Sequence, residues 1–103
     1  MSAYVISEVR IRDESLAGQY MKLAAASIEK HGGRYVVRGA EPVVAEGDWD
    51  DDRRVVVVEF PDMKHLEDWY ASSDYVEALK LRKDAVDRRL LFVHGVAPSN
   101  SER

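Results

Sequence analysis

Cysteine is absent from this sequence. Its absence excludes disulfide bonds, thiolate metal sites and cysteine nucleophiles. Long apolar runs are also missing, since no stretch approaches the roughly 18 apolar residues that a membrane-spanning helix needs. Residues Met1 to Arg12 lack the charged start and apolar centre of a signal peptide. We therefore expect a cytoplasmic protein with no membrane partner.

Positive charge is not in surplus either. The chain has 15 lysine and arginine residues against 19 aspartate and glutamate residues, so its formal net charge is −4. Nonspecific affinity for nucleic acids comes mainly from cationic side chains that neutralise phosphates. We therefore expect no nucleic-acid partner.

Motifs that bind metals or phosphates are missing as well. The acidic loop near Trp49 does not have the twelve-residue spacing of a calcium loop; its aspartates are Asp48, Asp50, Asp51 and Asp52. No two of the histidines have the i, i+4 spacing that places two metal ligands on one helix face; they are His31, His65 and His94. His31 or His94 could face a cavity, but nothing else in the sequence indicates a haem ligand. The sequence predicts no bound metal and no cofactor.

Apolar material, in contrast, suffices for one core. Of the 103 residues, 46% are hydrophobic and 33% are charged, which is typical of a globular domain. Two independent cores would not fit in a chain of this length. We expect a single domain over residues 1–96 and a polar tail over residues 97–103.

The spacing of apolar residues predicts alternating strands and helices. Strands are expected over Ala3–Ile11, Arg34–Arg38, Arg54–Phe60 and Leu90–Val96. Helices are expected from Asp13 to Gly32-Gly33, over Met63–Ala71 and over Asp74–Ala85. After a break over Gly39–Pro42, Val43–Glu46 is expected to continue extended, and Gly47–Asp52 to form a hairpin loop.

Capping side chains support the predicted helix ends. Asp13, Asp62 and the pair Ser72-Ser73 precede the three helices, and their oxygens can accept the free N–H groups of a first turn. Gly32-Gly33 suits the end of the first helix, because glycine adopts the left-handed conformation at little cost.

This order of elements is βαββαβ, with the last helix split in two. It predicts a ferredoxin-like α+β domain, in which an antiparallel four-stranded sheet carries its helices on one face.

The other face of the predicted sheet is too apolar to remain in water. Val55 and Val57 point opposite to Val56, Val58 and Phe60, and the last strand is apolar on both sides. An exposed apolar patch of this size usually marks an interface, and each large side chain left uncovered forgoes about 1.5–3 kcal/mol. We therefore expect a homodimer in which two sheets pack face to face as a dimeric α+β barrel.

Several segments, in order along the chain, resemble the bacterial domain of unknown function 1330 family over roughly Tyr4 to Val96. One departure is Ser73, where the family more often has proline. The matching segments are His31-Gly32-Gly33-Arg34, Arg38-Gly39, Glu46-Gly47-x-Trp49, Val57-x-Glu59-Phe60-Pro61, Trp69-Tyr70-x-Ser72-x-x-Tyr75, Arg82 and Val93-x-Gly95-Val96.

The resemblance implies a ferredoxin-like homodimer of the dimeric α+β barrel superfamily. The family has no established common reaction. Its barrel relatives include small cofactor-free monooxygenases, haem-degrading enzymes, muconolactone isomerase and purely ligand-binding or regulatory domains. A fold shared by so many activities cannot choose between them.

Polar side chains near the predicted helix ends are candidates for a ligand site. Arginines bind carboxylates and a tyrosine hydroxyl can orient them; the binding candidates are Arg38, Trp69, Ser72, Tyr75 and Arg82. Glu59 and His31 are the catalytic candidates, since each could transfer a proton.

Structural roles are the alternative for the same residues. Arg38 or Arg82 could pair with Glu59 or Glu46 and hold the dimer or the hairpin. Trp69 lies in an apolar stripe, which favours packing of helix against sheet over stacking on a substrate.

Two functions therefore remain open. The first is a homodimer that binds a small anionic or aromatic molecule, as a cofactor-free monooxygenase or isomerase would. The second is a non-catalytic homodimer with a structural or ligand-sensing role.

Overall fold

The computed structural model describes residues 1–49 and 52–96. The expectations for Asp50, Asp51 and the tail over residues 97–103 lie outside the described residues.

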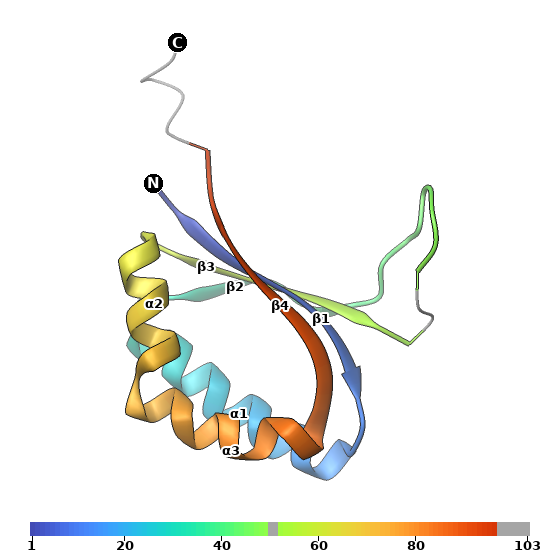
Figure 1. The fold of residues 1–103 in the computed structure, drawn as a ribbon, viewed down its shortest axis with the longest axis horizontal. Coiled ribbons are helices and arrows are strands. Elements are labelled where there is room, and N and C mark those ends of the chain that lie inside the picture. The colour runs from blue at the N-terminus through green and yellow to red at the C-terminus, as the bar shows by residue number, and fades with distance from the viewer. Residues whose placement is uncertain (50–51, 97–103) are drawn as a thin grey trace.

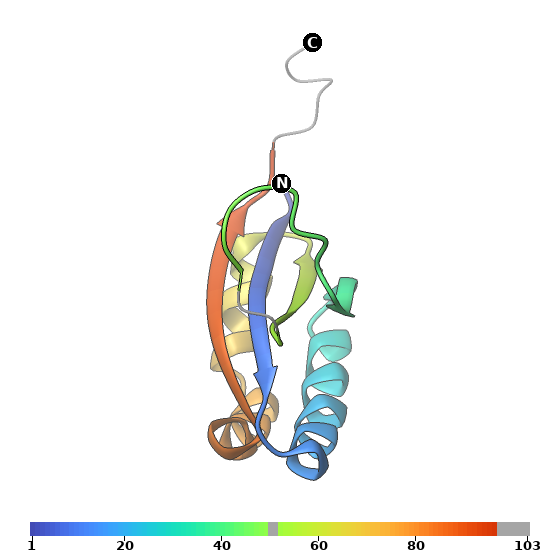
Figure 2. The same cartoon turned by 90° about the vertical axis from the view of Figure 1, so that its right-hand side faces the viewer.

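The described residues form an antiparallel four-stranded sheet with its helices packed against one face (Figures 1 and 2). The strand order is β2-β3-β1-β4, and β1 pairs with both β3 and β4. This confirms the predicted ferredoxin-like fold. The elements are β1 (Ala3–Ile11), α1 (Glu14–Lys30), β2 (Arg34–Ala40), β3 (Arg54–Phe60), α2 (Met63–Ala71), α3 (Ser73–Ala85) and β4 (Val86–His94).

Each helix begins at the capping side chain that the sequence predicts. Asp13 Oδ1 accepts the N–H of Leu16 at 3.0 Å, and Asp62 Oδ1 accepts the N–H of His65 at 2.8 Å. Ser72 Oγ accepts the N–H of Tyr75 at 3.1 Å. Ser72 is the single residue between the end of α2 and the start of α3. These bonds satisfy backbone donors that the first turn of a helix leaves free.

β1 and β3 have the predicted bounds, whereas β2 extends to Ala40, past the predicted end at Arg38, and β4 ends at His94, before the predicted end at Val96. β4 begins at Val86, four residues before the predicted start at Leu90. The chain passes from α3 into β4 without a loop, because Val86 both ends the helix and pairs with Ile11. The segment Val43–Glu46 is not a strand, and its Val43 is 95% exposed.

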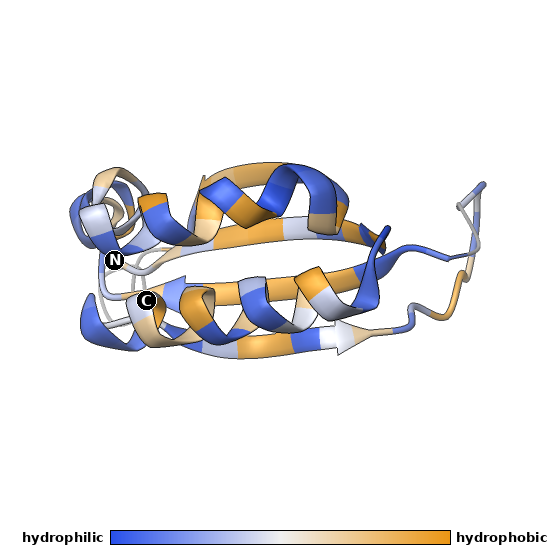
Figure 3. Ribbon diagram, turned by 90° about the horizontal axis from the view of Figure 1, so that it is seen from below, coloured by the Kyte–Doolittle hydropathy of each residue, from blue (hydrophilic) through white to orange (hydrophobic). Residues whose placement is uncertain are grey.

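The core residues come from the strands and from the helices packed on them. Figure 3 shows apolar residues (orange) recurring along both the helices and the strands. Phe60 and Trp69 have ring centroids 5.4 Å apart, and Trp69 and Tyr75 have centroids 4.2 Å apart. The buried Trp69 Nε1 donates to Ser27 Oγ at 2.9 Å. This aromatic cluster packs α2 and α3 against β3. It thereby holds these helices in place beside the part of the sheet that α1 covers.

The outer face of the sheet is apolar at its centre, and no helix of residues 1–49 and 52–96 packs against it. Register pairs Ile6 with both Val57 and Leu91, and Tyr4 with Val93. Leu91 is 56% exposed and Val93 36% exposed. Both faces of the sheet are therefore apolar, as the valine-rich strand predicts. Among the described residues, no helix is long and apolar enough to cross a membrane.

Candidate functional site

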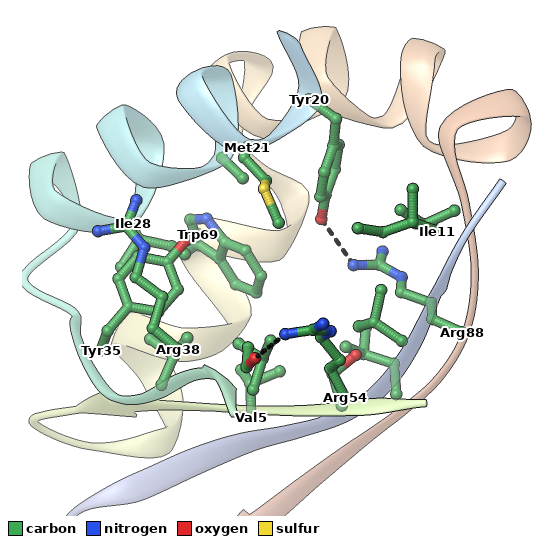
Figure 4. Close-up of a pocket in the computed structure, with 18 residues that line it drawn as sticks. Val5, Ile11, Tyr20, Met21, Ile28, Tyr35, Arg38, Arg54, Trp69 and Arg88 are labelled. Atoms are coloured by element: carbon green, nitrogen blue, oxygen red, sulfur yellow. Dashed lines mark hydrogen bonds between the residues drawn. The ribbon is translucent and has the colours of Figure 1, made fainter. Parts of the chain in front are cut away.

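A cavity of about 90 Å³ lies between the inner face of the sheet and α1 (Figure 4). Its walls are mostly aliphatic and aromatic, with Val5, Val56 and Val58 on the strands and Tyr20, Met21 and Ile28 on α1. Trp69 contributes part of the wall from α2. Such an apolar, concave space with few polar groups is the usual form of a small-molecule site.

Arg88 is the polar centre of this cavity. It lies on β4, and its guanidinium donates to the hydroxyl of Tyr20 at 2.6 Å and to the hydroxyl of Tyr75 at 2.8 Å. The two hydroxyls also bond each other at 2.7 Å. Figure 4 shows Tyr20 pointing from α1 toward Arg88. The three side chains join α1, α3 and β4 into one hydrogen-bonded group, which we call the Arg88–tyrosine triad.

No carboxylate of the described residues neutralises Arg88. The ion pairs among the described residues involve other cations, and the two hydrogen-bond partners of Arg88 are tyrosine hydroxyls. Burial, and then the neighbouring Tyr20, raise the pKa of Tyr75 above its ordinary value of 10.0. Both effects keep Tyr75 a neutral phenol near neutral pH. The triad therefore places one uncompensated positive charge beside an apolar space.

Two further arginines line the cavity from β2 and β3. Arg38 stacks over the ring of Tyr35, with 4.3 Å between the guanidinium carbon and the ring centroid. Arg54 donates to the carbonyl of Gly39 at 3.3 Å and lies 3.7 Å from Glu41. The lining residues include no aspartate, glutamate or histidine. The surroundings of the cavity are thus cationic, although the whole chain has a net charge of −4.

The structure brings three of the five predicted binding residues to this region. Arg38 and Trp69 line the cavity, and Tyr75 holds Arg88. Ser72 caps α3. Arg82 lies on α3 outside the cavity lining, and its Nε is buried without a hydrogen-bond partner among the described residues.

Glu59 and His31 lie apart from the cavity and from each other. Glu59 is on the outer side of the sheet, where it accepts from Arg34 Nε at 2.9 Å and Tyr4 Oη at 3.2 Å. Hydrogen bonds from Ser2 and Arg34 lower the pKa of Glu59 below its ordinary 4.5. His31 ends α1, with Nε2 3.6 Å from an oxygen of Asp74. Neither residue lines the cavity.

Arg88, Tyr20 and Ser7 are site residues that sequence reasoning missed. The run Asp87-Arg88-Arg89 looks like a polar connection, so the predicted strand began after it. Had the alternation of Leu90 and Phe92 been extended backwards, it would have placed Arg88 on the inner face. Tyr20 lies within the helix predicted from Asp13 to Gly32-Gly33, and its residue type alone does not mark it as a site residue.

The arrangement suits binding of an anion better than proton transfer. Arginine and phenol groups supply hydrogen-bond donors, and the raised pKa of Tyr75 keeps its hydroxyl protonated, so that it offers no phenolate to accept a proton. Since no carboxylate or imidazole is among the lining residues, a bound molecule meets no conventional general base there. Within the described residues, no group of three or more acidic or histidine side chains could hold a metal ion.

Known structures with the same fold include proteins of several kinds. The RPA0582 protein of unknown function from Rhodopseudomonas palustris is 24% identical, with a TM-score of 0.75 over 94% of this chain and 84% of its own. The cofactor-independent oxygenase SnoaB from Streptomyces nogalater is 10% identical, with a TM-score of 0.67 over 94% and 95%. A dimeric protein of unknown function from Bacteroides fragilis is 11% identical, with a TM-score of 0.54 over 91% and 96%.

A search of curated proteins gives no match. The similarity of solved structures shows the ferredoxin-like fold and leaves the activity open. A match over nearly the whole sequence is more specific: the family named Domain of unknown function (DUF1330) aligns with residues 2–96. The chain is therefore a member of the DUF1330 family.

Proposed function

We propose that this protein is a homodimer that binds a small anionic or aromatic molecule in the cavity between α1 and the sheet. The observation that carries the proposal is the cavity itself, an apolar space whose described lining residues include three arginines and no acidic residue. Rings prefer such walls because aromatic and aliphatic contacts replace water. Anions prefer it because a low-dielectric cleft strengthens the attraction of its positive charges.

Dimerisation through the outer face of the sheet is the second part of the proposal. Ile6, Val57, Leu91 and Val93 form a continuous apolar surface by register. Burying each large side chain would contribute about 1.5–3 kcal/mol, and a second copy offers the same surface in return. The Bacteroides fragilis protein, which has this fold, is dimeric. The cavity lies on the opposite face of the sheet and stays available in such a dimer.

Binding without turnover is the activity that the geometry supports best. A cofactor-free monooxygenase or an isomerase must take a proton from its substrate, and the cavity lining offers no carboxylate or imidazole for that step. Ligand sensing or carriage needs only the apolar walls and the triad. The oxygenase SnoaB shares the fold at 10% identity, which does not transfer its chemistry.

A cavity-filling variant tests the site. Ala24 lies on α1 against the cavity and is 3% exposed, so Ala24→Leu adds three carbon atoms to the space a ligand would occupy. Ala26→Leu is the matched control, because Ala26 lies on the same helix and is exposed. We expect aromatic acids to shift the amide NMR signals of β1, β3 and α1 in the wild-type protein and in Ala26→Leu, and not in Ala24→Leu.

Equal shifts in the two leucine variants would place the ligand elsewhere and contradict the proposal. Product formation from a bound acid under air, detected by mass spectrometry, would replace binding by catalysis as the function of the same cavity.

A further inference from the structure

The Arg88–tyrosine triad has more hydrogen-bond donors than its own members can use. A guanidinium has five N–H donors and no acceptor, and Arg88 uses one on Tyr20 and one on Tyr75. The bond between the two phenols needs one of their protons. This leaves three guanidinium N–H groups and one phenol O–H without an acceptor on a described residue.

Ser7 adds an unused hydroxyl to the same wall. It lies on β1 in the middle of a strand, is 3% exposed and lines the cavity. Its Oγ is buried and has no hydrogen-bond partner among the described residues. Ser7 pairs with Leu90 and Val9 pairs with Arg88, so Ser7 and Arg88 are diagonal neighbours on the inner face, within reach of one bound group.

A buried hydroxyl without a partner, such as Ser7 Oγ, is costly, and the half-buried Arg88 beside it keeps further N–H groups for a bound molecule. An unsatisfied buried polar group costs about 1–3 kcal/mol, and more for a charged group. An alanine at position 7 and an aliphatic residue at position 88 would fit the apolar wall without that cost. Such a cluster therefore indicates that something other than the chain itself completes the hydrogen bonds.

The missing partner must accept hydrogen bonds and carry negative charge. A carboxylate does both, since it has two oxygens with about four acceptor sites and no donor, and a planar guanidinium can bind it through two parallel bonds. Arg38 adds positive charge on the same lining, whereas the charge of Arg54 is opposed by Glu41 at 3.7 Å.

The size of the cavity limits the rest of the molecule. Its volume is about 90 Å³, against about 150 Å³ for an engineered cavity that takes up benzene. A single ring fits if the wall yields slightly, and Met21 allows this, because it lines the cavity while 40% exposed and its unbranched side chain adapts easily. A fused-ring compound would require the helix to move.

We propose that the ligand is a single-ring aromatic carboxylic acid, with its ring against the apolar walls and its carboxylate bonded by Arg88, Tyr20 and Ser7. This inference rests on the proposed function, whose cavity it uses, and adds the class and orientation of the ligand. Tyr75 does not line the cavity; it is a positioning residue that holds Arg88 and Tyr20.

Paired probes separate the anion site from the apolar cavity. Benzoate is ionised at neutral pH, and benzamide has the same shape without the charge. Charge-assisted hydrogen bonds are stronger than neutral ones, so we expect wild-type protein to bind benzoate at least about tenfold more tightly in calorimetric titrations. Raising the salt concentration should weaken benzoate binding more than benzamide binding.

Variants then assign that preference to the proposed residues. Arg88→Lys keeps the charge and loses the planar fork, so it should lower the affinity ratio of benzoate to benzamide at least about tenfold. Tyr20→Phe and Ser7→Ala remove one hydroxyl each and should lower the benzoate-to-benzamide affinity ratio less than Arg88→Lys does. These two variants still test the proposal if Arg88→Lys does not fold. Tyr75→Phe should also lower this affinity ratio, because Tyr75 positions Arg88. If Tyr75 only packed in the core, Tyr75→Phe would leave the ratio unchanged. Arg89→Lys is the control, because Arg89 is the next arginine of β4, lies on the outer face and does not line the cavity.

The failures of the two proposals are distinguishable. If benzoate and benzamide bind the wild-type protein equally well, the carboxylate assignment is overturned and the cavity remains a site for neutral rings. If the ratio falls as much in Arg89→Lys as in Arg88→Lys, the triad is not the anion site. If neither probe binds, both the ligand class and the proposed cavity function are wrong.

Discussion

Replacing Gly33 by alanine should destabilise the protein, for a reason that lies in the core. Gly33 follows α1 and does not have a positive φ, so the backbone itself would tolerate alanine. A Cβ there would lie 2.7 Å from Phe60 Cε1 and 2.8 Å from Ile28 Cγ2. Phe60 is 0% exposed and Ile28 4% exposed, so neither side chain can move out into solvent.

The magnitude follows from two opposing effects. Overpacking a core by one carbon costs about 1–3 kcal/mol, while replacing glycine by alanine stiffens the unfolded chain and returns about 0.4–1 kcal/mol. The net loss in the free energy of unfolding should be about 1–2 kcal/mol. Gly18→Ala is the matched control, since Gly18 lies within α1 and its Cβ would meet no atom within 4 Å; it should stabilise the helix by about 0.5–1 kcal/mol.

Urea denaturation followed by circular dichroism measures both variants against the wild type. All three should be compared at one protein concentration, because the stability of a homodimer depends on it. A Gly33→Ala protein as stable as Gly18→Ala would refute the described packing of Phe60 and Ile28 around this glycine.

Three further predictions concern the sheet and its charges. Leu91→Asp should convert the dimer to a monomer in analytical ultracentrifugation, because Leu91 lies on the outer face of the sheet. The control Val76→Asp changes an apolar residue of α3 that is 42% exposed, and it should remain dimeric. A Leu91→Asp protein that is still a dimer would contradict the proposed interface. Ser7→Ala should leave the urea stability of the free protein equal or higher, since it removes an unpartnered hydroxyl, and a clear loss of stability would show that Ser7 is satisfied within the protein. Hydrogen bonds hold the pKa of Asp62 (from the His65 backbone) and of Asp74 (from Lys30) below 3.8. A carboxyl with a lowered pKa stabilises the folded state at pH values above its unfolded pKa, and this effect is lost as the pH falls through its folded pKa. The urea concentration at the unfolding midpoint should therefore be constant near neutral pH and decrease when the pH is below about 4. A midpoint that increases on acidification would contradict these hydrogen bonds.

The fold was predictable because local signals agree with each other. Asp13, Asp62 and Ser72 cap the three helices as expected, and the valine run of β3 lies in the sheet with both faces apolar. The end of α3 at Ala85 agrees with the predicted end of that helix. The start of β4 at Val86 differs from the predicted start at Leu90. Charged residues at its beginning look like a loop, and only pairing with β1 makes them a strand.

The candidate site was predictable only in part. Sequence reasoning selected Arg38, Trp69 and Tyr75, which lie in or beside the cavity, but it selected Arg82 in place of Arg88. Both are arginines near the end of the chain, and their sequence contexts differ little. The two arginines differ in their tertiary contacts. The Arg88 side chain of β4 contacts Tyr20 of α1, which lies 68 residues earlier in the sequence.

The pairing of Glu59 illustrates the same limit. The structural alternative paired Arg38 or Arg82 with Glu59 or Glu46, and in the structure Glu59 pairs with Arg34 at 2.7 Å. Antiparallel register places Arg34 directly opposite Glu59, and this register depends on the bulge in β2, which the sequence does not reveal.

A crystal structure of the wild-type protein with benzoate would test the central claim most directly. The account predicts a ring between α1 and the sheet and carboxylate oxygens within hydrogen-bond distance of the Arg88 guanidinium and the Tyr20 hydroxyl. A benzoate whose carboxylate points away from Arg88, or a cavity that stays empty while benzoate binds elsewhere on the protein, would contradict it.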